Sequence, residues 1–234
     1  MSRTNFTNIT LFLLGCGVLV AAMAFWLGPK DSPEEVALTD TNEALVAPLN
    51  IDELAAYQTT MTNPNNPVAE FTTNLGDFSL ELYEDTMPIT TGNFVELAEK
   101  GFYDGIKFHR VIPGFMIQGG DPNTKTDNVA SYGTGGPGYA IPDEHVAGEK
   151  LTNLRGTISM ANSGPNSGGS QFFINVADNQ NLDFDKQPLS SKHPVFGQVI
   201  NGMEVVDAIA QVQRNERDLP LEPVVIESVK IVRE

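Results

Sequence analysis

The pattern of hydrophobic and polar positions divides the chain into three parts, and the first is an uncharged, mostly apolar run from Ile9 to Leu27. As a helix that rises about 1.5 Å per residue, this run would span roughly 28 Å. A membrane hydrocarbon core is about 30 Å thick. Phe25 and Trp26 stand at the far end of the run, where aromatic side chains favour the membrane interface. The pattern predicts a transmembrane signal-anchor over residues 1–28.

Two alternatives for this segment stay open. Ala22-Met23-Ala24 offers a site for a signal peptidase, so the protein could instead be secreted after cleavage. Leu13-Leu14-Gly15-Cys16 faintly resembles a lipidation box, but the apolar stretch continues past Cys16. Arg3 and the free amine precede the run, and positive charge stays on the cytoplasmic side of a membrane. We therefore expect the rest of the chain outside the cytoplasm, on the periplasmic side of an inner membrane.

Residues 29–67 form the second part, a polar stretch punctuated by proline that predicts a linker. One short helix is expected within it over residues 51–57, with Asn50 as its cap. The third part, residues 68–234, carries the patterning of one folded domain.

Short alternating segments dominate that domain. Phe78–Leu82 alternates apolar and polar residues, which is typical of a half-buried strand. Thr90 or Thr91 can cap a helix that runs to about Lys100, and Gly101 can end it in a left-handed turn. Further strands are expected over residues 108–112, 115–118, 157–160, 171–176, 195–200 and 224–232, and a second helix over residues 203–211. These elements predict a mainly β domain: a closed antiparallel barrel capped by two α-helices.

Composition narrows the function. Thirty acidic residues against fourteen basic ones give a net charge of −16, which disfavours binding to nucleic acid phosphates. The same acidity is also typical of a well-solvated surface. The single cysteine, Cys16, excludes a disulfide within the chain and a zinc site built on cysteines.

The segment Phe108–Asp121, with the sequence FHRVIPGFMIQGGD, carries the first candidate chemistry. Alternation on two strands around a Pro-Gly turn places Arg110 beside Met116 and Gln118, with Phe115 at the turn. A permanent cation against an apolar wall is an unusual grouping for a barrel interior. The alternative is an arginine in a surface ion pair beside an ordinary apolar core.

The segment Gly156–Ile174 carries the second group of candidate functional residues. Its centre, residues 162–170, is so rich in Gly, Ser and Asn that it predicts a loop between two strands. The strand that follows places Gln171 and Phe173 on one face. Main-chain groups over residues 161–163 are expected to be free to pair with an extended peptide.

These two segments, together with Asn181–Asp183 and Val195–Ile209, resemble the cyclophilin family of peptidyl-prolyl cis/trans isomerases, in family order and spacing from about Val68 onward. The resemblance implies an eight-stranded barrel with two helices and an isomerase that acts on proline-containing polypeptides in protein folding. It further implies a monomeric domain that needs no cofactor. A rival with the same fold is a non-catalytic, membrane-tethered chaperone or binding module.

By position, the resemblance makes Arg110 the catalytic residue. The residues expected to contact the proline ring are Phe115, Met116, Phe173 and Leu182. Those expected to hold the peptide backbone and the arginine side chain are Gln118, Ala161, Asn162 and Gln171. His193 is expected at the edge of the pocket. The family's usual tryptophan is replaced by Asn181, which puts cyclosporin binding in doubt.

Three weaker patterns point elsewhere. Gly133, Gly135 and Gly138 match a dinucleotide-binding spacing, but their flanks predict a loop rather than a strand and a helix. His145 follows two acidic residues, yet no second ligand stands at metal-binding spacing, and a solvated histidine is expected. No G-x-S-x-G turn supports a serine hydrolase.

Overall fold

The computed structural model describes residues 63–146, 151–187 and 192–233. The chain divides into two units, Met1–Val46 and Ala47–Glu234, and every described residue belongs to the second. The expected transmembrane segment, its cleavage site and the short helix over residues 51–57 lie outside the described residues. None of the described helices has the length and apolar character needed to cross a membrane.

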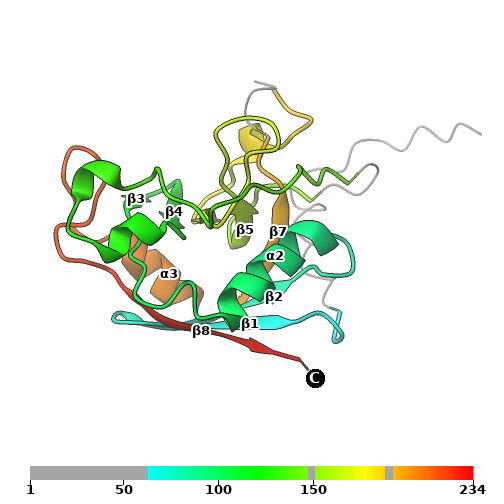
Figure 1. The fold of residues 1–234 in the computed structure, drawn as a ribbon, viewed down its shortest axis with the longest axis horizontal. Helices are drawn as coiled ribbons and strands as arrows, with labels where there is room; N and C mark the ends of the chain where they lie inside the picture. Colours follow the sequence, from blue (N-terminus) through cyan, green and yellow to red (C-terminus); the bar gives the residue numbers. More distant parts are fainter. Residues whose placement is uncertain (1–62, 147–150, 188–191, 234) are drawn as a thin grey trace, which may run out of the picture. The chain divides into compact units, whose positions relative to one another are not determined.

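Alternating side chains build one antiparallel sheet. Its eight strands are β1 Val68–Thr73, β2 Gly76–Leu82, β3 Arg110–Ile112, β4 Met116–Gly119, β5 Thr157–Met160, β6 Phe172–Asn175, β7 Val195–Asn201 and β8 Ile226–Val232. They lie in the order β3-β4-β6-β5-β7-β2-β1-β8. The mainly β fold with two helices is confirmed, and Figure 1 shows the red β8 beside the cyan β1.

The expected closed barrel is wrong, because the sheet curls into an open half-barrel whose terminal strands β3 and β8 do not pair with each other within the described residues. Val111 of β3 donates its main-chain N–H to the carbonyl of Asp218, in the loop before β8, at 2.9 Å. That loop therefore occupies the free edge of β3. The segment before β3 pairs with the start of β8, through an isolated bridge between Lys107 and Val225 and through hydrogen bonds of Gly105 and Ile106 with Ile226.

Strand β1 is an element that the hydrophobic pattern does not predict. Its inward positions are Ala69, Phe71 and Thr73, all buried, and only one of them is large and apolar. Burial against the neighbouring strands β2 and β8, rather than strong local alternation, makes this segment a strand.

Two α-helices, α2 Pro88–Glu99 and α3 Met203–Ala210, cover the concave side of the sheet. Helix α2 buries Phe94, Leu97 and Ala98, as predicted, and Gly101 follows it with a φ of 65°. Helix α3 buries Val206 and Ile209. Aromatic rings from both halves of the domain meet in the core, namely Phe71, Phe78, Phe94, Tyr103, Phe108, Phe172 and Phe196.

Helix α2 begins three or four residues earlier than a cap at Thr90 or Thr91 predicts. Thr90 and Thr91 are buried inside the helix, and the Thr91 hydroxyl donates to the carbonyl of Phe196 at 3.4 Å. Pro88 stands in the first turn, where its fixed φ suits a helix. The cap comes from a distant residue: the Glu144 carboxylate accepts hydrogen bonds from the N–H groups of Ile89 and Thr90, at 3.0 and 2.8 Å.

Replacing Glu144 with alanine is expected to lower the free energy of unfolding by about 1 kcal/mol, the usual loss for a helix cap. The change removes both acceptors from the first turn of α2, and the helix end also loses a favourable negative charge. Urea titration of the variant measures the loss. Asp143→Ala is the matched control, since it removes the same charge one residue away without a bond to the helix. Equal losses in the two variants would contradict the capping role.

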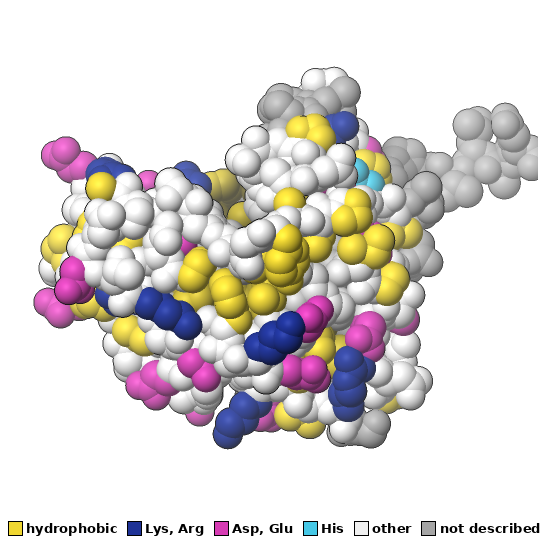
Figure 2. Space-filling model, in the orientation of Figure 1, with side chains coloured by type: hydrophobic (Ala, Val, Ile, Leu, Met, Phe, Trp, Pro, Cys, Tyr) yellow, Lys and Arg dark blue, Asp and Glu magenta, His cyan; other side chains and the backbone are white. Residues whose placement is uncertain are grey.

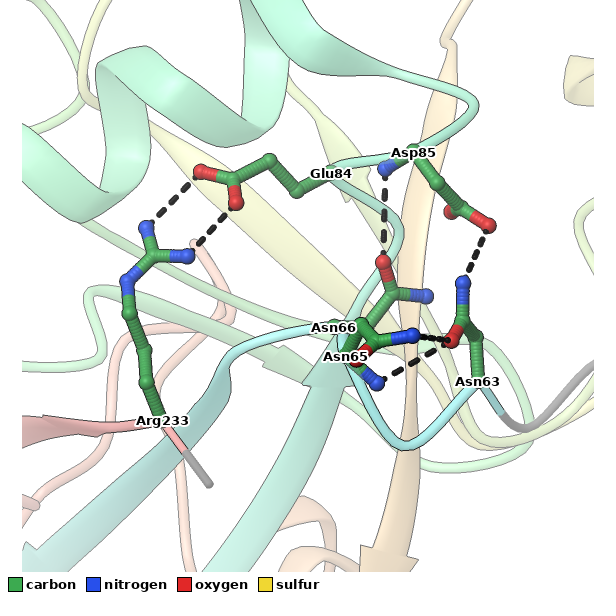
Figure 3. A network of polar contacts seen from close by, with 6 residues as sticks. All are labelled: Asn63, Asn65, Asn66, Glu84, Asp85 and Arg233. Atoms are coloured by element: carbon green, nitrogen blue, oxygen red, sulfur yellow. Dashed lines mark hydrogen bonds and ion pairs between the residues drawn. The ribbon is translucent and has the colours of Figure 1, made fainter.

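The two ends of the described domain are tied to the turn between β2 and α2. Figure 3 shows Asn63 donating to the Asp85 carboxylate at 2.9 Å, and Arg233 forming a two-pronged ion pair with Glu84. The hydrogen bond from Arg233 lowers the pKa of Glu84 below its usual value. Both ends of the described domain are thus held at the same corner.

Charge is dispersed over the surface. Figure 2 shows Asp and Glu side chains scattered across the visible face, with Lys and Arg among them, rather than gathered in one patch. This distribution fits a solvated acidic surface.

Candidate active site

The β3–β4 hairpin presents the candidate catalytic arginine on the outer face of the sheet. In the register of these strands Arg110 stands opposite Gln118, and Gln118 opposite Phe173 of β6. The intervening Val111 and Ile117 point to the other face and are buried in the core. The predicted sharing of a face is confirmed, but the expected barrel interior is wrong. The grouping faces outward because the alternate positions fill the core.

The turn of this hairpin holds Phe115 in place. Its N–H donates to the carbonyl of Ile112 at 3.0 Å, and its own carbonyl accepts from Val176 N–H at 3.0 Å and from Asn179 Nδ2 at 2.9 Å. The half-buried ring lies 6.0 Å from the Arg110 guanidinium carbon. This distance is within the range of a cation–π contact.

The side chain of Arg110 is exposed and makes no hydrogen bond or ion pair with any described residue. The alternative of an arginine tied up in a surface ion pair is therefore wrong. A guanidinium carries five N–H donors in a rigid plane. All of them stay available at the edge of an apolar wall.

The glutamines that were expected to hold the arginine bond to other groups. Gln118 Nε2 donates to Gln171 Oε1 at 3.1 Å, and Gln171 Nε2 donates to the carbonyl of Gly135 at 2.8 Å. Neither amide is hydrogen-bonded to Arg110. The chain of amides instead links the hairpin to the glycine-containing loop and fixes the orientation of both glutamines.

The loop over residues 162–170 is confirmed, but only part of the main chain over residues 161–163 is free. The N–H of Ala161 donates to the Gln171 carbonyl at 3.0 Å, and that of Ser163 donates to Ser167 Oγ at 2.9 Å. The N–H and carbonyl of Asn162 have no partner among the described residues. Its side chain donates to the Lys192 carbonyl at 2.7 Å, which holds the free groups in position.

His193 closes the opposite edge. Its Nδ1 donates to the Met160 carbonyl at 3.1 Å, and its ring meets Phe173 edge-on at 5.4 Å between ring centres. The main-chain N–H of His193 donates to the carbonyl of Leu182 at 3.0 Å. Leu182 is the last residue of the short 3₁₀ helix η3 Gln180–Leu182. Burial lowers the pKa of His193, which keeps the ring neutral near pH 7.

A buried polar network that sequence reasoning missed supports this edge. Asn153 donates from its main chain and its side chain to Asp183, at 2.7 and 2.8 Å, and from its side chain to the His193 carbonyl at 3.2 Å. Its Oδ1 accepts from Ser159 Oγ at 2.7 Å. Asp183 belongs to the Asn-Leu-Asp motif, but no pattern in the sequence pointed to Asn153.

Together these elements enclose a cavity of about 320 Å³, here called the candidate pocket. Its lining consists of Arg110, Phe115, Met116, Gln118, Ala161, Asn162, Phe173, Leu182 and His193. The remaining predicted residue, Gln171, lines an adjacent cavity of about 470 Å³ together with Gln118, Ala161 and Asn162. The structure thus gathers residues from four separate segments around one opening. Asn181 is exposed and does not line the candidate pocket.

The glycine pattern around Gly133 and the histidine His145 have structural roles among the described residues. Gly133 donates its N–H to the buried Asp121 carboxylate in a loop, as predicted. His145 is half-buried rather than solvated, and its ring stacks on Phe184 at 4.7 Å. The described part of the chain brings together no group of three or more His, Cys, Asp or Glu at metal-binding distance.

The geometry can be compared with known proteins. The family model for cyclophilin type peptidyl-prolyl cis-trans isomerase/CLD matches residues 68–231. The chain is similar to peptidyl-prolyl cis-trans isomerase A of Dickeya dadantii, with 40% identity over 194 residues, which cover 81% of this chain and 97% of that one. It is 43% identical over 171 residues to a peptidyl-prolyl cis-trans isomerase of Acinetobacter baylyi, covering 71% and 86% of the two chains.

Another relative is longer. The chain spans 42% of the length of a putative bifunctional phosphatase/peptidyl-prolyl cis-trans isomerase of Streptococcus pyogenes, with 39% identity over 206 residues. Among solved structures, a cyclophilin type peptidyl-prolyl cis-trans isomerase of Cryptosporidium parvum matches with a TM-score of 0.61 and 29% identity, covering 72% of this chain and 99% of that chain. The chain therefore belongs to the family of cyclophilin-type peptidyl-prolyl cis/trans isomerases.

Proposed function

We propose that Arg110 catalyses the cis/trans isomerisation of X–Pro bonds by binding the twisted amide more tightly than either planar isomer. The observation that carries this proposal is a guanidinium without a partner among the described residues, at the rim of a cavity walled by Phe115, Met116 and Phe173. The substrates are proline-containing segments of unfolded or extended polypeptides, and the protein assists their folding.

The chemistry follows from amide resonance. Rotation about a peptide bond has a barrier of about 18–20 kcal/mol because it breaks the conjugation between the nitrogen and the carbonyl. Uncatalysed X–Pro exchange therefore takes tens to hundreds of seconds. In the twisted state the prolyl nitrogen regains a lone pair, which a guanidinium N–H can meet. A donor that is satisfied only in that state lowers the barrier without proton transfer or a covalent intermediate.

The pocket supplies the geometry that rotation needs. The apolar walls hold the proline ring, and the free main-chain groups of Asn162 pair with the peptide beside it. With both held, only the residue before the proline has to swing. Because the apolar side chains exclude water, the contact with Arg110 is stronger than it would be in bulk solvent.

An exchange experiment on a peptide with one Ala-Pro bond tests this function. The full-length chain in detergent is added at catalytic concentration, and the rate of cis/trans exchange is measured by NMR. The proposal expects a rate that rises in proportion to protein concentration. Binding of the peptide without any gain in rate would overturn it in favour of the non-catalytic chaperone or binding module.

The pH dependence separates this mechanism from acid–base catalysis. Burial lowers the pKa of His109 to about 4, and burial likewise lowers the pKa of His193, so both rings stay neutral at and above neutral pH. Arginine keeps its charge over the whole range. We expect kcat/KM to be level between about pH 7 and pH 9. A bell-shaped profile within that window would contradict the mechanism, since it would require a titrating acid or base.

We also propose that the protein binds cyclosporin weakly, because Asn181 offers neither the indole N–H nor the apolar surface of a tryptophan. Asn181→Trp is expected to tighten binding at least about tenfold, as one hydrogen bond and the added apolar contact together contribute more than 1 kcal/mol. Titration calorimetry measures the change. Asn181→Leu is the matched control that adds apolar surface without the donor. No gain in Asn181→Trp would show that another feature sets the affinity.

For the rest of the chain we propose an anchor over residues 1–28, a linker over residues 29–67 and a monomeric isomerase domain outside the cytoplasm. The uncharged run from Ile9 to Leu27 and the slight excess of positive charge before it support this arrangement. Protease added to intact spheroplasts should digest the domain, and the mass of the mature N-terminus should show no cleavage after Ala24. Protection of the domain would contradict the proposed orientation.

A further inference from the structure

Some arginines of this acidic domain form ion pairs with Asp or Glu side chains, and others do not. Five lie in the described part of the chain, and three are paired with acids: Arg155 with Asp207 at 2.6 Å, Arg214 with Asp218 at 3.4 Å and Arg233 with Glu84 at 2.6 Å. Arg110 and Arg217 make no ion pair with any described residue, although the chain carries a net charge of −16. These two unpaired cations line one and the same cavity.

That cavity, here called the two-arginine cavity, has a volume of about 220 Å³. Arg110 and Arg217 lie on its wall, and no Asp or Glu of the described residues lines it. Its one histidine, His109, is buried and neutral near pH 7, since burial lowers its pKa to about 4. Two positive charges thus face a small opening that holds no compensating negative charge from the described residues.

The loop that carries Arg217 is fixed by its own hydrogen bonds. Asn215 Oδ1 accepts from the N–H groups of Arg217 and Leu219, at 2.9 and 3.2 Å. The carbonyl of Asp218 accepts from Val111 N–H at 2.9 Å, which joins the loop to β3 beside Arg110. The base of the Arg217 side chain is therefore held at a set place relative to the catalytic candidate, while its charged end is exposed.

The two-arginine cavity shares part of its wall with the candidate pocket. Arg110 and Gln118 line both. An extended peptide advances about 3.3–3.6 Å per residue, so a chain whose proline fills the candidate pocket reaches the neighbouring cavity within a few residues. The side chain that arrives there meets two guanidinium groups.

We propose that the two-arginine cavity binds an Asp or Glu side chain of the substrate, located within three residues of the isomerised proline, and that Arg217 is a specificity-determining residue. A carboxylate is the group whose planar, charged acceptors match a guanidinium. This inference rests on the proposed isomerase function, and it narrows the substrate class to prolines near an acidic residue.

The test compares matched peptides with the full-length protein. Each peptide carries one Ala-Pro bond and, at one of the three positions on either side, either Glu or Gln. We expect the Glu peptide to have a kcat/KM about fivefold higher than the Gln peptide at one of these positions, at low ionic strength. In Arg217→Gln that ratio should fall to near one, and in the wild type it should shrink as salt rises.

Lys230→Gln is the control variant, because it removes one positive charge from an exposed position on β8 that does not line the cavity. It should keep the wild-type ratio. A ratio near one at every position in the wild type, or an unchanged ratio in Arg217→Gln, would overturn the proposal. The Gln peptides alone report the isomerase function, so failure of that function is seen as absent catalysis on them and is distinct from a failed preference.

Discussion

Replacement of Arg110 with alanine is expected to lower kcat/KM for an Ala-Pro peptide by about 100- to 1,000-fold, the loss that follows removal of one preorganised donor to a transition state. The guanidinium acts only when the amide is twisted, so its loss raises the barrier without weakening the binding of planar substrate to the same degree. We therefore expect kcat to fall far more than KM changes. Exchange spectroscopy on the full-length variant measures both.

The fold should not change in this variant. The side chain of Arg110 is exposed and makes no hydrogen bond or ion pair with any described residue, and substitutions at such positions shift stability by less than about 0.5 kcal/mol. Arg110→Lys keeps the charge but loses the planar fork of donors, so most of the loss should remain. If Arg110→Ala stays within about threefold of the wild type, another group must provide the stabilisation, and the mechanism proposed for this pocket is wrong.

Asn153→Ala should produce the largest loss of stability, about 3 kcal/mol of unfolding free energy. Asn153 is fully buried, and its side chain bonds to Asp183, Ser159 and the carbonyl of His193. Truncation removes one buried hydrogen bond from each of them, and Ser159 Oγ then has no other partner among the described residues, while Asp183 keeps its bond from the Asn153 main chain. A buried polar group that loses its partner costs about 1–3 kcal/mol. Because His193 lines the candidate pocket, the variant should also bind substrate more weakly while it is still folded.

Urea unfolding followed by circular dichroism measures this effect. Asn128→Ala is the matched control, since Asn128 is exposed and its side chain makes no cap hydrogen bond in its 3₁₀ turn. The control should lose less than about 0.5 kcal/mol. A loss below about 1 kcal/mol in Asn153→Ala would mean that water or rearrangement satisfies the network.

Much of the site is predictable because it depends on local geometry. Alternation along a strand is a property of the backbone, so two strands joined by the Pro113-Gly114 turn place Arg110 and Gln118 on one face. The helix faces of Phe94 and Leu97 follow from helical periodicity in the same way. These patterns do not depend on what the segments pack against.

Tertiary contacts decided the rest. Helix α2 begins at Pro88 because Glu144, from a distant loop, accepts the hydrogen bonds of its first turn. The sequence of the helix itself does not predict this partner. Strand β1 exists because two neighbours bury its small inward side chains. The support of His193 by Asn153 joins residues forty positions apart, and no local pattern marks such a pair.

By itself the sequence determined the order of both α-helices and of every strand except β1, which side chains share a face of a strand, and the identity of the grouped candidates, because backbone periodicity is set within a few residues. Only the tertiary structure decided that the sheet stays open, that the arginine faces outward rather than inward, and that Arg217 lies beside it. The reason is physical, because both outcomes depend on contacts between segments far apart in the chain. The Asp218 carbonyl accepts a hydrogen bond from the edge of β3, and Val111 and Ile117 are buried in the core while their polar neighbours stay outside it.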